Sequence, residues 1–173
     1  MKHDSGDQKT LADLFRAAIA LEEQAGAIYD QLSHRFAHVP EIHAFWKGMQ
    51  ADEIGHAEAL ETIRDSQTAA DLSRRIDPKM WSEAVEINRF LSGDRVRMVE
   101  TLDDAYMLAH EIEFSEVNAI FKFLAVKSVS LEARSDFVLS QIRQHQEKIT
   151  SFNHTFGDRA WRRSILASGA TAP

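Results

Sequence analysis

The stretch MQADEIGHAEAL, residues 49–60, places a carboxylate and an imidazole in an otherwise apolar helical pattern. Glu53 and His56 are three residues apart, so in a helix both side chains point to one face. The same face continues in apolar residues at steps of three and four, namely Ile42, Trp46, Met49, Leu60 and Ile63. Because this spacing is typical of a helix stripe that faces a core, we expect Glu53 and His56 to be buried.

Three further segments have the same spacing, and each carries polar residues near the middle of its stripe. The first segment runs through Leu11, Phe15, Ala18, Glu22, Ala25, Tyr29, Leu32 and Phe36. A later segment runs through Leu102, Tyr106, Ala109, Glu113, Glu116, Ile120 and Phe123. The last runs through Val138, Ile142, His145, Ile149, Phe152 and Phe156. The sequence therefore predicts four helices with polar side chains in their buried stripes.

The connections between these helices predict how they are arranged. The short connection AHVPEI, residues 37–42, makes the first two helices antiparallel neighbours, and its proline suits a helix start. Residues 64–100 form a long stretch that can cross the length of a bundle, with a short helix expected in KMWSEAVEINRFLS. The fold we predict is all-α, an antiparallel four-helix bundle with one long crossover between helices 2 and 3. The bundle domain covers residues 1–156, and residues 157–173 form a tail that we expect to be loosely ordered near its end.

The composition excludes several classes of protein. The chain has 173 residues, 44% of them hydrophobic and 27% charged, which suits one domain with a sizeable core. It has no cysteine, so disulfides, a rubredoxin-type centre and iron–sulfur clusters are excluded. The net charge of −7 argues against a general nucleic-acid binder. No apolar run could span a membrane, and the polar N-terminus lacks the core of a signal peptide, so we expect a cytoplasmic protein.

The polar residues in the stripes predict a metal site. A buried ionised carboxylate costs several kcal/mol unless it is paired or bound to a cation, and no lysine or arginine falls on any stripe. Four carboxylates and two imidazoles at one level suit two divalent metal ions, iron or manganese, and zinc also accepts such ligands. The residues that we predict as ligands are Glu22, Glu53, His56, Glu113, Glu116 and His145.

Each of these features has a simpler interpretation when it is taken alone. A single Glu-x-x-His is usually a surface pair, Glu113 with Glu116 is usually a solvated face, and His145 is usually a core histidine. Their common position in the stripes favours the metal site. Glu23 would replace Glu22 if the first helix were rotated. The acidic residues off the stripes and the basic RRSIL segment are interpreted as surface charge: Glu23, Asp52, Glu58, Glu111 and residues 162–166.

With these motifs in place, the chain resembles the ferritin-like superfamily, specifically the rubrerythrin-type di-iron domain, over residues 8–156. ALEEQAGAIY is similar to the first-helix motif, with Glu22 seven residues before Tyr29. FWKGMQADEIGHAEAL looks like the second-helix motif, and EIEFSEVNAIF carries a glutamate pair similar to that of the third helix. QIRQHQEKI supplies His145 for the fourth helix.

The fourth helix departs from the family pattern, because Ile142 and Gln141 stand where that pattern has a second glutamate. Either Glu116 compensates for the missing ligand, or one metal position is weak or empty. Rubrerythrins usually also carry a rubredoxin domain that feeds electrons to the metals. A chain without cysteine has no such domain, so the resemblance implies a separate electron-donor protein.

The resemblance implies an oxidoreductase in which a di-iron or di-manganese centre reduces peroxide or oxygen, and we expect a homodimer. It implies that Glu53 bridges the ions, that Glu22 and Glu113 are terminal ligands, and that Glu116 is a mobile or second ligand. His56 and His145 would bind one ion each, and Tyr29 would orient a ligand or donate a hydrogen bond. Two alternatives stay open: a ferroxidase or iron-handling protein, and a non-catalytic bundle with a degenerate metal site, which Ile142 favours.

Overall fold

The computed structural model describes residues 8–114 and 143–168, and nearly all of its elements are helices. These are α1 (Leu11–Arg35), α2 (Pro40–Asp65), α3 (Ala69–Leu72), α4 (Pro78–Leu91), the 3-10 helix η1 (Arg95–Met98), α5 (Leu102–Glu113), a helical segment over residues 143–150, α8 (Phe152–Phe156) and α9 (Arg159–Ser164). The described ranges contain no strand beyond two isolated bridges, which confirms the all-α prediction. No helix in these ranges is both long and apolar enough to cross a membrane.

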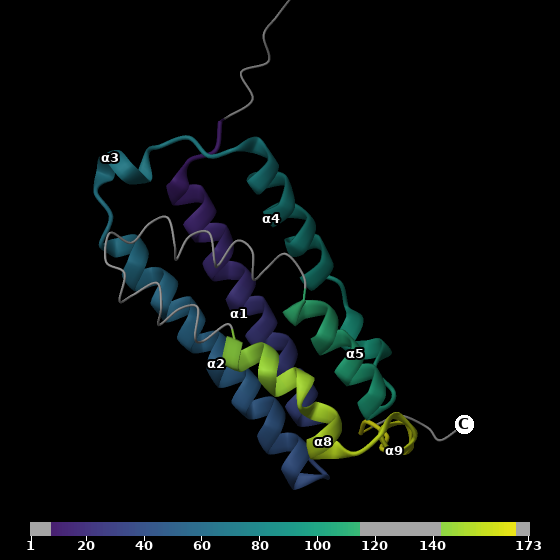
Figure 1. Cartoon of the computed structure of the whole chain (residues 1–173). Helices are drawn as coiled ribbons and strands as arrows, with labels where there is room; N and C mark the ends of the chain where they lie inside the picture. Colours follow the sequence, from purple (N-terminus) through teal and green to yellow (C-terminus); the bar gives the residue numbers. More distant parts are fainter. Residues whose placement is uncertain (1–7, 115–142, 169–173) are drawn as a thin grey trace, which may run out of the picture.

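Helices α1 and α2 form an antiparallel hairpin that carries most of the core (Figure 1). Thr10 caps α1 through a reciprocal pair of hydrogen bonds with Asp13, and Pro40 occupies the first turn of α2, where a proline costs no hydrogen bond. The predicted stripes are buried in both helices; for example, Phe15, Tyr29 and Trp46 are fully inaccessible to solvent. The two long helices therefore place residues of their stripes opposite each other.

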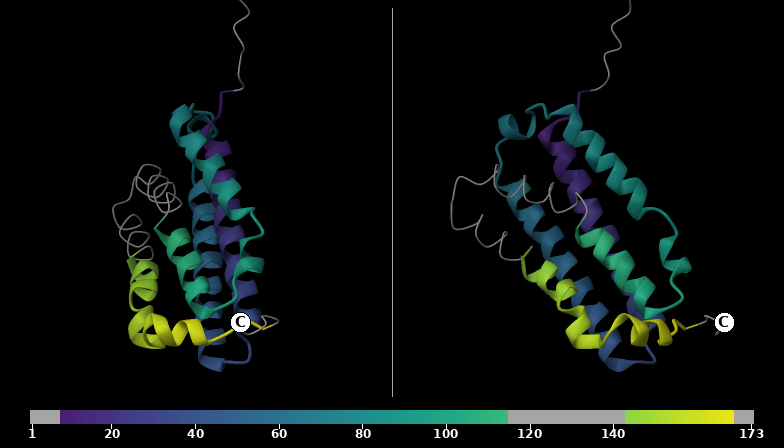
Figure 2. Two further views of the ribbon diagram at one scale, coloured as in Figure 1. Left: turned by 90° about the vertical axis from the view of Figure 1, so that its right-hand side faces the viewer. Right: turned by 45° about the vertical axis from the view of Figure 1, so that its right-hand side comes forward.

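The stretch between α2 and α5 contains α3, α4 and η1. The predicted short helix is confirmed as α4, which begins at Pro78 and is capped by Asp77, whose side chain accepts a hydrogen bond from the backbone of Lys79. α4 lies beside α1 and returns the chain to the end of the molecule where α5 begins (Figures 1 and 2). It buries its apolar stripe there, and Gln24 donates a hydrogen bond of 2.8 Å to Asn88 across the contact.

The later part of the predicted bundle is only partly described. α5 begins at the predicted stripe residue Leu102 and ends at Glu113, and residues 143–150 with α8 carry the last part of the fourth stripe. Residues 115–142 lie outside the described ranges, and with them the end of the third predicted helix and the start of the fourth. The complete four-helix bundle with its crossover stays a prediction.

The C-terminal segment differs from the sequence prediction, because Arg162 in the RRSIL stretch is buried and not solvated. Its side chain is 3% exposed and donates from Nε and Nη2 to Asp103 of α5, at 3.2 and 2.9 Å. Arg159 donates to the other oxygen of Asp103 at 2.9 Å, and the Arg162 guanidinium lies 4.6 Å from the ring centre of Tyr106. The prediction failed because the partner carboxylate is some sixty residues away, where local composition gives no sign of it.

Charge balance in this cluster favours an ionised Asp103. Burial alone would raise the pKa of this carboxyl, but hydrogen bonds from Arg159 and Arg162 and their positive charges outweigh burial, so the pKa lies below its usual value. The folded state therefore stabilises the ionised carboxylate relative to the unfolded chain. This contribution is present above the unfolded pKa, about 3.9, and is lost as the pH falls through the lower folded value.

Replacing Asp103 with asparagine leaves the Arg162 guanidinium buried without its counter-ion. We expect Asp103→Asn to lower the free energy of unfolding by about 3 kcal/mol at pH 7, and the difference from wild type to shrink below about pH 4. Urea denaturation followed by circular dichroism at both pH values measures this. Asp94, whose ion pair with Arg97 is exposed, provides the control, and Asp94→Asn should have little effect. Equal losses in the two variants would contradict a structural role for the buried pair.

Candidate metal centre

The polar residues predicted for four stripes meet in the interior. Glu22 and Tyr29 come from α1, Glu53 and His56 from α2, Glu113 from α5, and His145 from the helical segment 143–150. Every one of these side chains is buried, with at most 5% of the residue exposed. The helix face that carries Glu53 and His56 therefore points into the core, as the spacing predicted.

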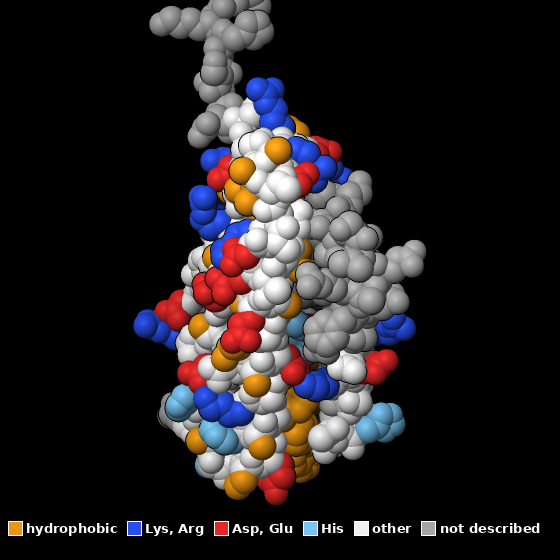
Figure 3. Space-filling model, turned by 90° about the vertical axis from the view of Figure 1, so that its left-hand side faces the viewer, with side chains coloured by type: hydrophobic (Ala, Val, Ile, Leu, Met, Phe, Trp, Pro, Cys, Tyr) orange, Lys and Arg blue, Asp and Glu red, His pale blue; other side chains and the backbone are white. Residues whose placement is uncertain are grey.

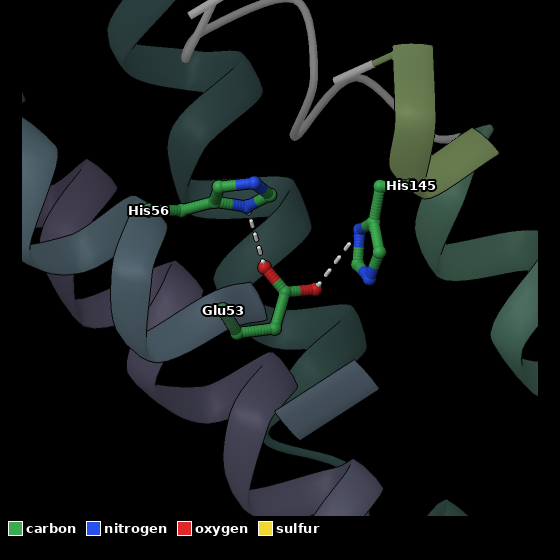
Figure 4. A group of neighbouring side chains, drawn as sticks. All are labelled: Glu53, His56 and His145. Atoms are coloured by element: carbon green, nitrogen blue, oxygen red, sulfur yellow. Dashed lines mark hydrogen bonds and ion pairs between the residues drawn. The ribbon is translucent and has the colours of Figure 1, made fainter. Parts of the chain in front are cut away.

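Glu53 lies between the two histidines (Figure 4). Its Oε2 atom is 3.0 Å from His56 Nδ1, and its Oε1 atom is 3.7 Å from His145 Nδ1. The two imidazole rings stand at 85° to each other, with their centres 5.4 Å apart. One ligand atom from each of the three residues lies within 4.8 Å of the others, which is close enough for all three to contact one cation.

Two more carboxylates extend this group on either side. Glu22 Oε2 lies 3.6 Å from His56 Nδ1, and Glu113 Oε2 lies 2.9 Å from His145 Nδ1. The Tyr29 hydroxyl donates a hydrogen bond of 2.5 Å to the other oxygen of Glu113. Each histidine therefore faces Glu53 and one outer carboxylate.

A glycine allows α1 and α2 to approach closely at this level. Gly26 lies one turn after Glu22, and a Cβ atom added there would lie 3.4 Å from Glu53 Cβ and 3.8 Å from the backbone oxygen of Gln50. These are ordinary contact distances, so alanine fits, whereas a longer side chain would have to displace Glu53. The position of the Glu53 side chain depends on the small residue opposite it.

The electrostatics of the group favour a bound cation. Among the described residues, Glu22 and Glu53 pair with histidines and with no lysine or arginine. Burial raises the pKa of Glu53 well above its usual value, and the negative charges of Glu22 and Glu113 add to the rise. A divalent ion would offset this cost, and carboxylate oxygens with imidazole nitrogens suit iron, manganese or zinc. The donor set present in this part of the chain therefore fits such an ion.

Tyr29 is held as a neutral hydrogen-bond donor. Burial raises the pKa of its phenol well above 10, and the charges of Glu113 and Glu53 raise it further. Its ring stacks on Trp46, with ring centres 5.9 Å apart and planes inclined by 8°. Tyr29 therefore keeps its proton and fixes the orientation of Glu113.

Asp52 contributes to the centre, although the sequence analysis interpreted it as a surface charge. Its Oδ2 atom lies 3.6 Å from His145 Nε2 and forms an ion pair with Lys148, and its side chain is only 26% exposed. His145 Nε2 has no hydrogen-bond partner among the described residues. A carboxylate that accepts a hydrogen bond from the far nitrogen of a histidine ring orients the ring for metal binding through the near nitrogen, here Nδ1, and Asp52 lies beside that far nitrogen but beyond hydrogen-bond distance. The sequence feature that could have revealed this position of Asp52 is the adjacent Asp-Glu pair in ADEIGH. That pair could be interpreted only once the position of the segment that carries His145 was known.

The remaining predicted residues divide into two groups. Glu23, Glu58 and Glu111 are exposed, as expected, and the buried position of Glu22 makes the rotated alternative with Glu23 unnecessary. Glu116 and Ile142 lie outside the described residues, so the ligand count at a second ion position stays a prediction.

No family model, curated protein or solved structure matches this chain. The arguments for its function therefore come from the site itself.

The raised pKa of Glu53 leads to a prediction for protein treated with a chelator. Folding favours the protonated form of the Glu53 carboxyl. Its contribution to the free energy of unfolding is therefore complete below the pKa of the unfolded chain, about 4.3, and is lost as the pH rises through the higher pKa of the folded state. Glu53→Gln cannot ionise, so this variant should be more stable than wild type at pH 8 and similar to it near pH 4. Chemical denaturation at both pH values measures the difference.

The control is Glu58→Gln, which removes an exposed carboxylate from the same helix and should show no such gain at pH 8. A chelator-treated wild type that is more stable than Glu53→Gln at pH 8 would show that the buried charge is already neutralised by its neighbours.

Proposed function

We propose that this chain is a non-haem metal carboxylate protein, with a di-iron or di-manganese centre, that acts as a rubrerythrin-like oxidoreductase on peroxide or oxygen. The observation that supports this proposal best is the buried position of Glu53 between His56 and His145, with all three within reach of one cation. Replacing buried ion pairs with apolar residues is often neutral or stabilising, so a ligand role gives a reason for an acidic residue between two buried imidazoles.

The contacts support a division of roles among the carboxylates. Glu53 directs one oxygen toward each histidine, which suits a ligand shared by two ions. Glu22 lies on the side of His56, and Glu113 lies on the side of His145, which suits terminal ligands. Bound iron or manganese would supply the change of oxidation state that reduction of peroxide or oxygen requires.

The protein would supply positioning, proton control and exclusion of water. Tyr29 holds a proton on its hydroxyl, 2.5 Å from Glu113, and so can restrict that carboxylate to one orientation. Asp52 would orient the ring of His145 from the far side. Trp46 and Phe152, fully buried with ring centres 5.6 Å apart, close the interior beside Tyr29. These 173 residues contain no cysteine, so the proposal includes an electron donor other than a cysteine-ligated centre within them, in our hypothesis a separate donor protein.

Metal content provides the first test. Protein produced with iron, without a metal-binding tag, should contain about two ions per chain by mass spectrometry, as the proposed pair requires. The double variant His56→Ala/His145→Ala should contain almost none, because it loses both imidazole ligands. His34→Ala, which removes an exposed histidine from α1, is the matched control and should retain the metal. One ion per chain would exclude the pair, and none after anaerobic reconstitution would favour the non-catalytic bundle.

Peroxide consumption tests the activity. Iron-loaded wild type supplied with a chemical reductant should consume peroxide, and Glu53→Ala should not exceed the background rate. Tyr29→Phe keeps the ring and loses the hydrogen bond to Glu113, so we expect a loss of about tenfold or more. Glu58→Ala serves as the exposed control on α2. Metal-loaded wild type no faster than Glu53→Ala would reject the peroxidase and leave metal binding standing.

A further inference from the structure

A groove of about 500 Å³ lies between α1 and α2 on the outer side of the hairpin. Ile54, half exposed, and the small residues Ala27 and Ala57 form part of its lining. Figure 3 looks onto the left-hand side of Figure 1, where α2 lies, and shows acidic side chains on that face among basic and apolar ones. The groove is large enough for a hydrated metal ion to enter from solvent.

The groove has a strongly negative lining. Five acidic residues line it, and no lysine or arginine is among the described lining residues: the acids are Glu22, Glu23, Asp30, Glu58 and Glu61. Lys47 neutralises Asp30 at 2.6 Å, and Arg64 lies 3.6 Å from Glu61. Glu23 and Glu58 are exposed at the rim and have no ion pair with another described residue. A concave surface lined by charges of one sign raises the local concentration of ions of the opposite sign.

The inner side of the groove reaches the candidate metal centre. Glu22 lines the groove but is only 4% exposed, and its carboxylate lies 3.6 Å from His56 Nδ1. Gly26 also lines the groove, and a Cβ atom added there would lie 3.4 Å from Glu53 Cβ, so Glu53 lies directly behind this glycine. Glu22 therefore belongs to the groove lining and, through its carboxylate, to the centre, and Gly26 lies between the groove and Glu53.

We propose that this groove is a route by which divalent cations enter the centre. Glu23 and Glu58 would attract a cation to the rim, and Glu22, which lines the groove and faces His56, would bind it on its way to the ligands of the centre. The inference rests on the proposed metal-binding function. The proposed route adds that Glu23 and Glu58 at the rim control the rate at which the cation enters the centre, but are not ligands of the bound ion.

Stopped-flow mixing with Co²⁺ tests this route, because the visible absorption of bound Co²⁺ reports its ligands. The variant is Glu23→Gln/Glu58→Gln at the rim. The matched control is Glu41→Gln/Glu86→Gln, which removes the same number of charges at exposed positions of α2 and α4 outside the groove. At low ionic strength, we expect the rim variant to bind Co²⁺ at least threefold more slowly than the control, and this difference to shrink at high salt. The number of ions bound at equilibrium should be equal in both.

The outcomes separate the route from the function. Equal association rates in the rim variant and the control, with normal final occupancy, would overturn the route and leave the metal centre intact. Fewer bound ions in the rim variant would also overturn it, because Glu23 or Glu58 would then be a ligand. No Co²⁺ binding to wild type would overturn the proposed function, and the route with it.

Discussion

The buried carboxylate of Glu53 is the constraint on which the rest of this structure depends. Removing an ionised group from water is expensive, and here two further carboxylates, Glu22 and Glu113, are buried beside it. The fold tolerates this concentration of negative charge because it surrounds the group with the side chains that a cation also requires. Two imidazoles face the carboxylates, a phenol donates to one of them, and close helix packing at Gly26 fixes their separation. The contacts that hold the fold together at this level are therefore those that a bound cation would also use.

The two sides of the centre differ in character. On one side, Trp46 packs edge to face with Phe45 and lies against Phe152, and these rings keep water from Tyr29. On the other side, a polar and negatively charged groove runs up to Glu22. The proton of the Tyr29 hydroxyl is therefore held on the aromatic side of the centre, whereas small ions can approach on the side of the groove. A uniformly apolar shell would protect the site but would slow its loading.

The sequence predicted the two long helices and the burial of Glu22, Glu53 and His56, because steps of three and four residues reveal which face of a helix is hidden. It also predicted that Glu113 and His145 would be buried, although only the geometry of the packed helices shows which carboxylate each histidine meets. Asp52 and Arg162 were misinterpreted for a shared reason. Each is polar and outside a stripe, and each is paired with a residue far away in the chain. Periodicity describes one helix at a time, so it cannot identify partners that come from another.

The close approach at Gly26 also has a consequence for recognising distant relatives by sequence. A glutamate of the candidate centre, a glycine one turn later and a tyrosine three residues after that occupy a single face of α1, and the glycine lies where α1 approaches α2 closely. Together with Asp-Glu-x-x-His on the next helix, this gives the compact signature E-x-x-x-G-x-x-Y followed by D-E-x-x-H. Chains that share these two motifs at the separation seen here would be expected to share the geometry of the centre, even where the remaining residues have diverged beyond detectable similarity.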